Sequence, residues 1–134
     1  MLGEQIGETR GQVLVRRVVP SEGAPKVEVS FEAQGQLVGI STTDMGTYVS
    51  TIQPDGTLYG EGCGLTRSTD NSEIATWRGS GVGRFAQDGG VSYRGAIYFQ
   101  SQTPGFARLN GIAALFEYTV DASGKTESTL TEWK

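Results

Sequence analysis

Glycine stands at alternate positions of three strand-like segments in the middle of the chain, three times each within residues 58–64 and 77–85 and once within 91–99. Side chains of a β-strand alternate between the two faces of a sheet, so each alternate set lines one face. That face carries large apolar residues at its ends and glycine in its middle. Glycine weakens an ordinary strand, so this pattern indicates a strongly coiled sheet, a close approach of another backbone, or space that is kept free.

Alternating apolar and polar residues predict further strands on both sides of this region. Loops rich in proline, glycine and aspartate separate them, among them Pro54-Asp55-Gly56 and the Asp-Gly-Gly of residues 88–90. The segment 27–33 is expected to continue through 37–40 after a bend or bulge, and 42–44 is expected to be a turn. The eight predicted strands are residues 12–19, 27–40, 47–53, 58–67, 73–86, 91–100, 108–120 and 126–133.

Two segments leave alternatives open. Residues 1–11 have mixed polarity and predict a short first strand or, preferably, an arm that adds to a sheet edge. Residues 109–118 contain helix-forming residues, but their period-two alternation continues, so a strand is preferred.

The predicted fold is all-β, an eight-stranded antiparallel up-and-down barrel that forms a single domain over residues 1–134. Tight turns join the strands, and no helix is long enough for a crossover between parallel strands. Closing such a meander removes its two exposed edges, and about eight strands leave an interior that side chains fill or that holds one small ligand. A β-sandwich is the competing architecture.

Charge and composition narrow the classes of function. The chain has a formal net charge of -4 and scattered basic residues, which argues against binding to nucleic acid. It has no apolar run near the length of about 20 residues that a membrane span needs, and residues 1–11 lack the core of a signal peptide. A single cysteine, Cys63, rules out an internal disulfide. We therefore expect a cytoplasmic protein with no membrane partner.

The residue inventory also limits the chemistry. The chain contains no histidine, which removes the commonest general base and metal ligand, and one cysteine cannot build a zinc site. We therefore expect no metal and no cofactor. The run Gly79-Ser80-Gly81-Val82-Gly83 has the glycines of a phosphate loop but lacks the Lys-Ser/Thr ending and the helix that follows one.

Residues 54–62 (PDGTLYGEG) and 73–85 (EIATWRGSGVGRF) resemble the barrel proteins related to plant allene oxide cyclases and dirigent proteins, in which a hairpin strand is likewise followed by an A-x-x-G-x-G-x-G-x-F strand. The resemblance spans residues 54–85, about a quarter of the chain. It implies an eight-stranded barrel, often trimeric, whose lumen holds an apolar or phenolic substrate and guides its cyclisation or coupling. The family's catalytic residues have no matching positions here.

The aromatic residues on the glycine-rich face are the candidate ligand-binding residues, with hydroxyl and indole groups as polar contacts. The alternative is ordinary core packing, with glycines making room for rings on neighbouring strands. The predicted ligand-binding residues are Trp77, Tyr93, Phe99, Phe116 and Tyr118.

The opposite face carries charged and polar residues, which favours a solvated outer surface; if it were the lumen instead, a glutamate beside arginines would be an acid/base or anion site. This set comprises Glu61, Cys63, Arg78, Ser80, Arg84, Arg94, Tyr98, Gln100 and Glu117.

The sequence thus predicts a module that binds a small apolar or phenolic molecule in its lumen. Two alternatives stay open, a cyclase or isomerase that acts on such a ligand and a purely structural, oligomer-forming protein. A homo-oligomer, trimer or dimer, is expected in each case. A connected internal cavity would favour the first two functions, and an ionisable group inside it would favour the enzyme.

Overall fold

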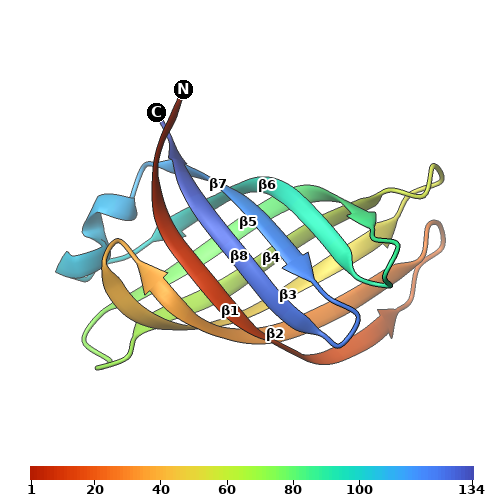
Figure 1. The fold of residues 1–134 in the computed structure, drawn as a ribbon, viewed down its shortest axis with the longest axis horizontal. Coiled ribbons are helices and arrows are strands. Elements are labelled where there is room, and N and C mark those ends of the chain that lie inside the picture. Colours follow the sequence, from red (N-terminus) through yellow and green to blue (C-terminus); the bar gives the residue numbers. More distant parts are fainter.

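The computed structural model describes residues 1–134 and forms a closed barrel of eight antiparallel strands that follow one another in chain order (Figure 1). Each strand pairs with its neighbours in the sequence, and the first pairs with the last, which closes the barrel. The predicted all-β, eight-stranded up-and-down barrel is confirmed. Its strands are β1 (Leu2–Val19), β2 (Lys26–Leu37), β3 (Ile40–Ile52), β4 (Leu58–Ser68), β5 (Ile74–Phe85), β6 (Val91–Gln100), β7 (Ala113–Val120) and β8 (Lys125–Trp133).

The first strand differs from the prediction. Residues 1–11 are not an arm, because Gly7 pairs with Leu37 of β2 on one side and with Leu130 of β8 on the other. They form the first half of the 18-residue β1, the strand that closes the barrel. The two chain ends lie side by side in Figure 1, and the Lys134 amide donates a hydrogen bond of 2.7 Å to the Met1 carbonyl.

A tight turn at Val38 and Gly39 separates β2 from β3, so the predicted continuation through residues 37–40 and the predicted turn at 42–44 are both wrong. Val38 has φ 46° and Gly39 has φ 80°, and Leu37 pairs directly with Ile40. A β-branched residue rarely adopts a positive φ, so valine gives no signal of such a turn. Residues 42–44 instead lie within β3.

A short 3-10 helix, η1 (Pro104–Leu109), takes the place of the beginning of the predicted strand 108–120. Its Phe106 and Leu109 side chains are fully buried and cover one end of the barrel, which we call the η1 end. They pack there in a core cluster with Ile6, Leu37, Ala75, Ile97, Phe99, Ala114 and Leu130. The loops at 20–25, 53–57, 86–90 and 121–124 lie at the opposite, hairpin end.

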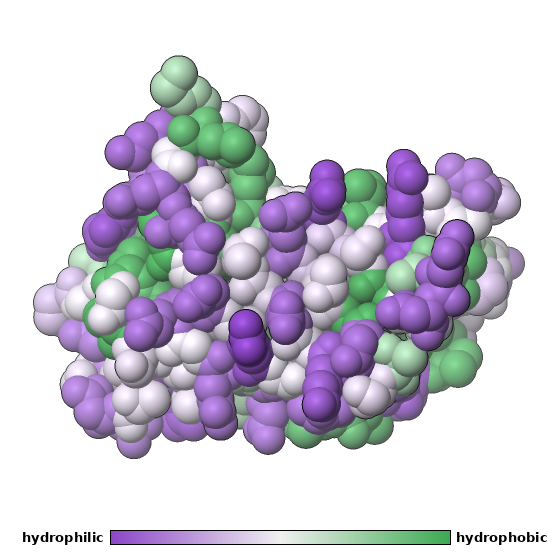
Figure 2. All heavy atoms as spheres, viewed as in Figure 1, coloured by the Kyte–Doolittle hydropathy of each residue, from purple (hydrophilic) through white to green (hydrophobic).

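The outer face of the sheet is polar. Figure 2 shows hydrophilic side chains spread over the visible face, with smaller apolar patches between them, beside the chain ends, on the right and along the lower edge. All nine residues predicted for the solvated face are exposed, Cys63 among them. The outer ion pair Arg94–Glu117, at 3.5 Å, joins β6 to β7. Of the charged residues in this set only Glu61 borders the lumen, and no arginine lies there with it, so the outer-face alternative of an acid/base or anion site loses its support.

Candidate functional site

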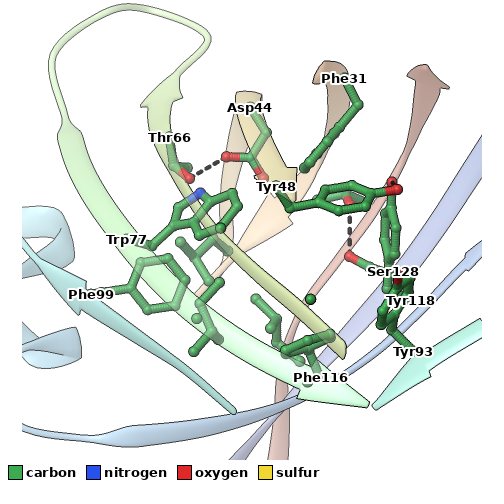
Figure 3. Close-up of a pocket in the computed structure, with 18 of the residues that line it drawn as sticks. Phe31, Asp44, Tyr48, Thr66, Trp77, Tyr93, Phe99, Phe116, Tyr118 and Ser128 are labelled. Carbon is green, nitrogen blue, oxygen red and sulfur yellow. Dashed lines mark hydrogen bonds between the residues drawn. The ribbon is translucent and has the colours of Figure 1, made fainter. Parts of the chain in front are cut away.

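A cavity of about 100 Å³ lies in the middle of the barrel, and we call it the lumen cavity. All five predicted ligand-binding residues, Trp77, Tyr93, Phe99, Phe116 and Tyr118, line it, as Figure 3 shows. Two further rings, Phe31 and Tyr48, complete the wall and escaped the prediction. Phe31 and Tyr48 stand at the alternate positions of β2 and β3 whose side chains face inward. This alternation in the sequence was the signal that could have found them.

The glycine stripe makes room for these rings. A Cβ atom at Gly64 would lie 2.2 Å from the Trp77 ring, and one at Gly81 would lie 2.9 Å from Phe116. A Cβ at Gly60 would lie 3.1 Å from Tyr93. The core-packing interpretation of the stripe therefore describes most of the lumen, and the lumen cavity is the space that the rings leave.

Three tyrosines form a layer across the barrel between the lumen cavity and the hairpin end. The ring centroids of Tyr48 and Tyr93 are 5.8 Å apart, and those of Tyr48 and Tyr118 are 5.6 Å apart. The Tyr118 hydroxyl donates to the Tyr48 hydroxyl at 3.3 Å, and the Tyr93 hydroxyl is hydrogen-bonded to Ser50. Burial raises the pKa of Tyr48 to about 12 and also raises the pKa of Tyr93 and Tyr118. All three hydroxyls therefore stay protonated at neutral pH.

Asp44 is the ionisable group that the sequence prediction missed. It lies in β3 four residues before Tyr48, on the same inward face of the strand, and its carboxyl group points into the lumen cavity (Figure 3). The Thr66 hydroxyl donates a hydrogen bond to it, and the indole nitrogen of Trp77 points toward the same carboxyl group. Burial raises the pKa of Asp44, and the polar groups of Thr66 and Trp77 offset part of that rise.

Asp44 is the carboxylate of the inner wall. Glu61 also borders the lumen cavity, but it stands at an outward-facing position of β4 and is exposed to solvent. Its carboxylate accepts a hydrogen bond of 2.8 Å from the Tyr59 hydroxyl. The lumen therefore combines aromatic walls with one half-buried carboxyl group, that of Asp44. Such a group can donate or accept a proton at a bound molecule, because its raised pKa brings it closer to neutral pH.

A second cavity, of about 350 Å³, lies on the other side of the tyrosine layer at the hairpin end, and we call it the mouth cavity. Tyr48 and Tyr93 border both cavities. The charged residues at the mouth cavity are Arg16 and Asp121. Its apolar wall consists of Val27, Val29, Ile52, Leu58, Phe85, Val91, Val120 and Ala122.

The fold and its cavities define a closed eight-stranded β-barrel with an aromatic lumen. The fold is similar to that of a protein of unknown function from Rhodopseudomonas palustris, with a TM-score of 0.82 and 10% identity over 98% of this chain and 97% of that one. It is also similar to a beta-barrel like protein from Acinetobacter baumannii, with a TM-score of 0.81 and 9% identity over 99% and 96% of the two chains.

A third solved structure is described as an enzyme from Penicillium herquei, and it has a TM-score of 0.64 and 17% identity over 96% of this chain and 92% of that one. At these identities the similarity concerns the fold. No protein-family model and no curated protein sequence matches the chain. The single helix, η1, is too short to cross a membrane.

Proposed function

We propose that the protein binds a small apolar or phenolic molecule in the barrel interior. The observation that carries this proposal is the space left among inward-facing rings, about 100 Å³ in the lumen cavity. A pocket with mostly apolar walls and a few convergent polar groups is the usual form of a small-molecule site. Here the polar groups include Asp44, Thr66 and the tyrosines, together with Thr9, Gln36, Thr42 and Ser128.

The volume limits what the lumen cavity accepts. A buried apolar cavity of roughly 150 Å³ is known to hold one benzene molecule. The lumen cavity is somewhat smaller, so it suits a single ring or a short branched chain. A larger ligand would extend through the tyrosine layer into the mouth cavity, which is in the range of about 300 Å³ and above that is typical of ligand sites.

A second candidate function is a cyclase or isomerase that acts on such a ligand, and the specific observation in its favour is Asp44. A half-buried carboxyl group with a raised pKa beside an apolar cavity is suited to proton transfer. The resemblance to allene oxide cyclases and dirigent proteins and the fold similarity to a structure described as an enzyme support this candidate. Asp44→Asn separates the two functions, because an enzyme would lose turnover of the bound molecule while a binding module would keep its affinity.

The structural alternative is a homo-oligomer, a trimer or dimer, with no ligand. Light scattering coupled to size-exclusion chromatography measures the assembly directly. Oligomer formation is compatible with ligand binding, so the ligand test below decides between the functions.

Filling the lumen cavity tests the proposal. Leu130 lines this cavity on β8, and Leu130→Phe would place a ring in the free space. The matched control is Leu115→Phe, the same change on the outer face of β7. A thermal-shift and tryptophan-fluorescence screen of phenols and terpenoids should find molecules that raise the melting temperature of the wild type and of Leu115→Phe, but not of Leu130→Phe.

Trp77 reports on the lumen in this screen, because its ring borders the cavity, whereas Trp133 is 56% exposed and lies at the chain end. Product analysis of each hit by mass spectrometry, with Asp44→Asn alongside, tests the enzyme candidate. A screen without hits, or hits that Leu130→Phe binds as well as the wild type does, would contradict binding in the lumen.

A further inference from the structure

A β-bulge in β1 places Arg16 on the inward-facing side of the strand at the rim of the mouth cavity, where its side chain stays exposed to solvent. Val13 pairs with Phe31 of β2, but the next pair is Val15 with Ser30, so Leu14 is an extra residue. Strict alternation from Val13 would place Val15 inside and Arg16 outside. After the bulge Arg16 pairs with Val29, which is 6% exposed and faces inward, and Val15 is 56% exposed. Bulges are frequent at barrel rims, where they re-aim a side chain, and this one exchanges a valine for an arginine.

Arg16 is the cation of the mouth cavity, and no protein group neutralises it. Arg10, Arg17, Arg94 and Arg108 each lie within 4.0 Å of a glutamate carboxylate, but no carboxylate lies that close to Arg16, and its guanidinium makes no hydrogen bond. Burial raises the pKa of Tyr48 and Tyr118, and the positive charge of Arg16 offsets part of this rise. The guanidinium is therefore close enough to interact electrostatically with the tyrosines at the floor of the cavity.

The other charged group at the mouth cavity is already engaged. The Asp121 carboxylate accepts hydrogen bonds from the Ser123 amide at 2.9 Å, the Ser123 hydroxyl at 2.7 Å and the Lys125 amide at 3.0 Å. These bonds hold Asp121 in the turn between β7 and β8, where it would disfavour a second negative charge on a ligand. A singly charged anion fits a cavity with one free cation and one fixed carboxylate.

The rest of the mouth cavity is apolar on its walls and hydroxylated on its floor. The walls include buried Val29, Leu58 and Val120, and the floor carries Tyr48 and Tyr93. A ligand that occupies the cavity therefore needs an apolar body and one polar end that meets the guanidinium.

We propose that the mouth cavity binds an amphipathic monocarboxylate, with the carboxylate held by Arg16 at the rim and the apolar body packed between the strands toward the tyrosine layer. The planar guanidinium matches a carboxylate with two parallel hydrogen bonds, and the single charge of a carboxylate is favoured over the higher charge of a phosphate beside the fixed carboxylate of Asp121. The proposal rests on the proposed function, since it names the ligand class that the barrel interior accepts.

Octanoate and 1-octanol test this proposal as a matched pair, since they share one chain and differ in the charged end. Calorimetric titration measures both affinities, and methyl chemical shifts of Val29 and Val120 report whether each molecule enters the mouth cavity. Arg16→Met removes the charge and keeps a long apolar side chain. Arg17→Met is the control, because Arg17 lies on the outer face and pairs with Glu28 at 3.3 Å.

The wild type should bind octanoate more tightly than 1-octanol, and Arg16→Met should weaken octanoate binding about tenfold, the scale of one charge-assisted contact, while leaving 1-octanol unchanged. Arg17→Met should leave both affinities unchanged. If 1-octanol binds as tightly as octanoate, or Arg16→Met has no effect on octanoate, the carboxylate assignment is wrong while lumen binding stands. If neither molecule nor any phenol or terpenoid binds, the proposed function and this assignment both fail.

Discussion

At the residue scale, the lumen depends on how a few polar groups are satisfied. A buried carboxylate is costly unless hydrogen bonds or charges compensate it, and Asp44 has the Thr66 hydroxyl as its hydrogen-bond donor and the Trp77 indole close by. No cation borders the lumen cavity. The protonated form of Asp44 is therefore favoured more strongly in the folded protein than in the unfolded chain, and this makes its contribution to stability depend on pH.

The pH dependence of stability should identify Asp44. Its folded pKa is raised above the unfolded value of 3.8, so its stabilisation is fully present below 3.8 and is lost as pH rises through the folded pKa. The unfolding free energy of the wild type, measured relative to Asp44→Asn by urea denaturation, should therefore fall as pH rises from about 4 toward neutrality.

Asp55→Asn is the control with the opposite sign. Hydrogen bonds from Thr57 lower the pKa of Asp55, so its stabilisation is present above 3.8 and is lost as the medium becomes more acidic. The wild type should gain stability relative to Asp55→Asn as pH rises. A difference between the wild type and Asp44→Asn that does not change with pH would show that Asp44 is solvated like an ordinary carboxylate.

Gly64→Ala tests the space that the glycine stripe provides. The new methyl group would overlap the Trp77 ring, which also stacks on Phe31 with centroids 6.4 Å apart, so the ring must move. We expect a loss of about 1 to 3 kcal/mol in unfolding free energy, the usual cost of overpacking. Gly23→Ala, in a loop with no atom within 4 Å of the new Cβ, should change stability little. Equal denaturation midpoints for the two variants would contradict the packing role.

The sequence predicted which rings face inward, because alternation along β5, β6 and β7 is unbroken. It did not predict Asp44, because a Thr-Thr-Asp segment is typical of a turn and the real turn lies at Val38 and Gly39. Arg16 could not be placed either. Its orientation depends on the extra residue Leu14, and a bulge is visible only in the register with β2.

At the element scale, η1 covers one end of the barrel, and no helix covers the hairpin end. Pro104 begins it, since proline suits the first turn of a helix, and Phe106 and Leu109 insert between the ends of the strands. The predicted strand across residues 108–112 failed because this segment buries its apolar residues at a helical spacing of three. With the η1 end covered, the hairpin end is the side from which a ligand reaches the tyrosine layer.

Phe106→Ala should show how much this cover contributes. Phe106 is 0% exposed, and removing its ring should cost about 3 to 5 kcal/mol, the range for a buried phenylalanine. Tyr98→Ala, on the outer face with 51% exposure, should cost about 1 kcal/mol or less. Chemical denaturation of both variants gives the comparison, and a loss for Phe106→Ala no larger than that for Tyr98→Ala would mean that η1 merely rests on the surface.

At the scale of the whole molecule, closure of the barrel is incomplete along one strand. Residues 7–12 of β1 pair with both β2 and β8, and residues 2–5 pair only with β8, while residues 14–19 extend past β8 and pair only with β2. This overhang carries the bulge and Arg16 and forms part of the rim of the mouth cavity. An unpaired strand edge leaves backbone donors and acceptors to solvent or to another chain.

Amide hydrogen exchange should reveal the overhang. We expect the amides of residues 14–19 that point away from β2 to exchange much faster than those of Thr9, Arg10 and Gly11, which lie between β2 and β8, because only local opening is needed at the free edge. Exchange measured by NMR at several protein concentrations tests this, with the β2-bonded amides of the same segment as internal controls. If exchange is slow throughout the segment and becomes slower as the protein concentration rises, a second copy covers the edge and this edge is the interface of the expected oligomer. If exchange is equally slow at every concentration, the edge is protected within the single barrel.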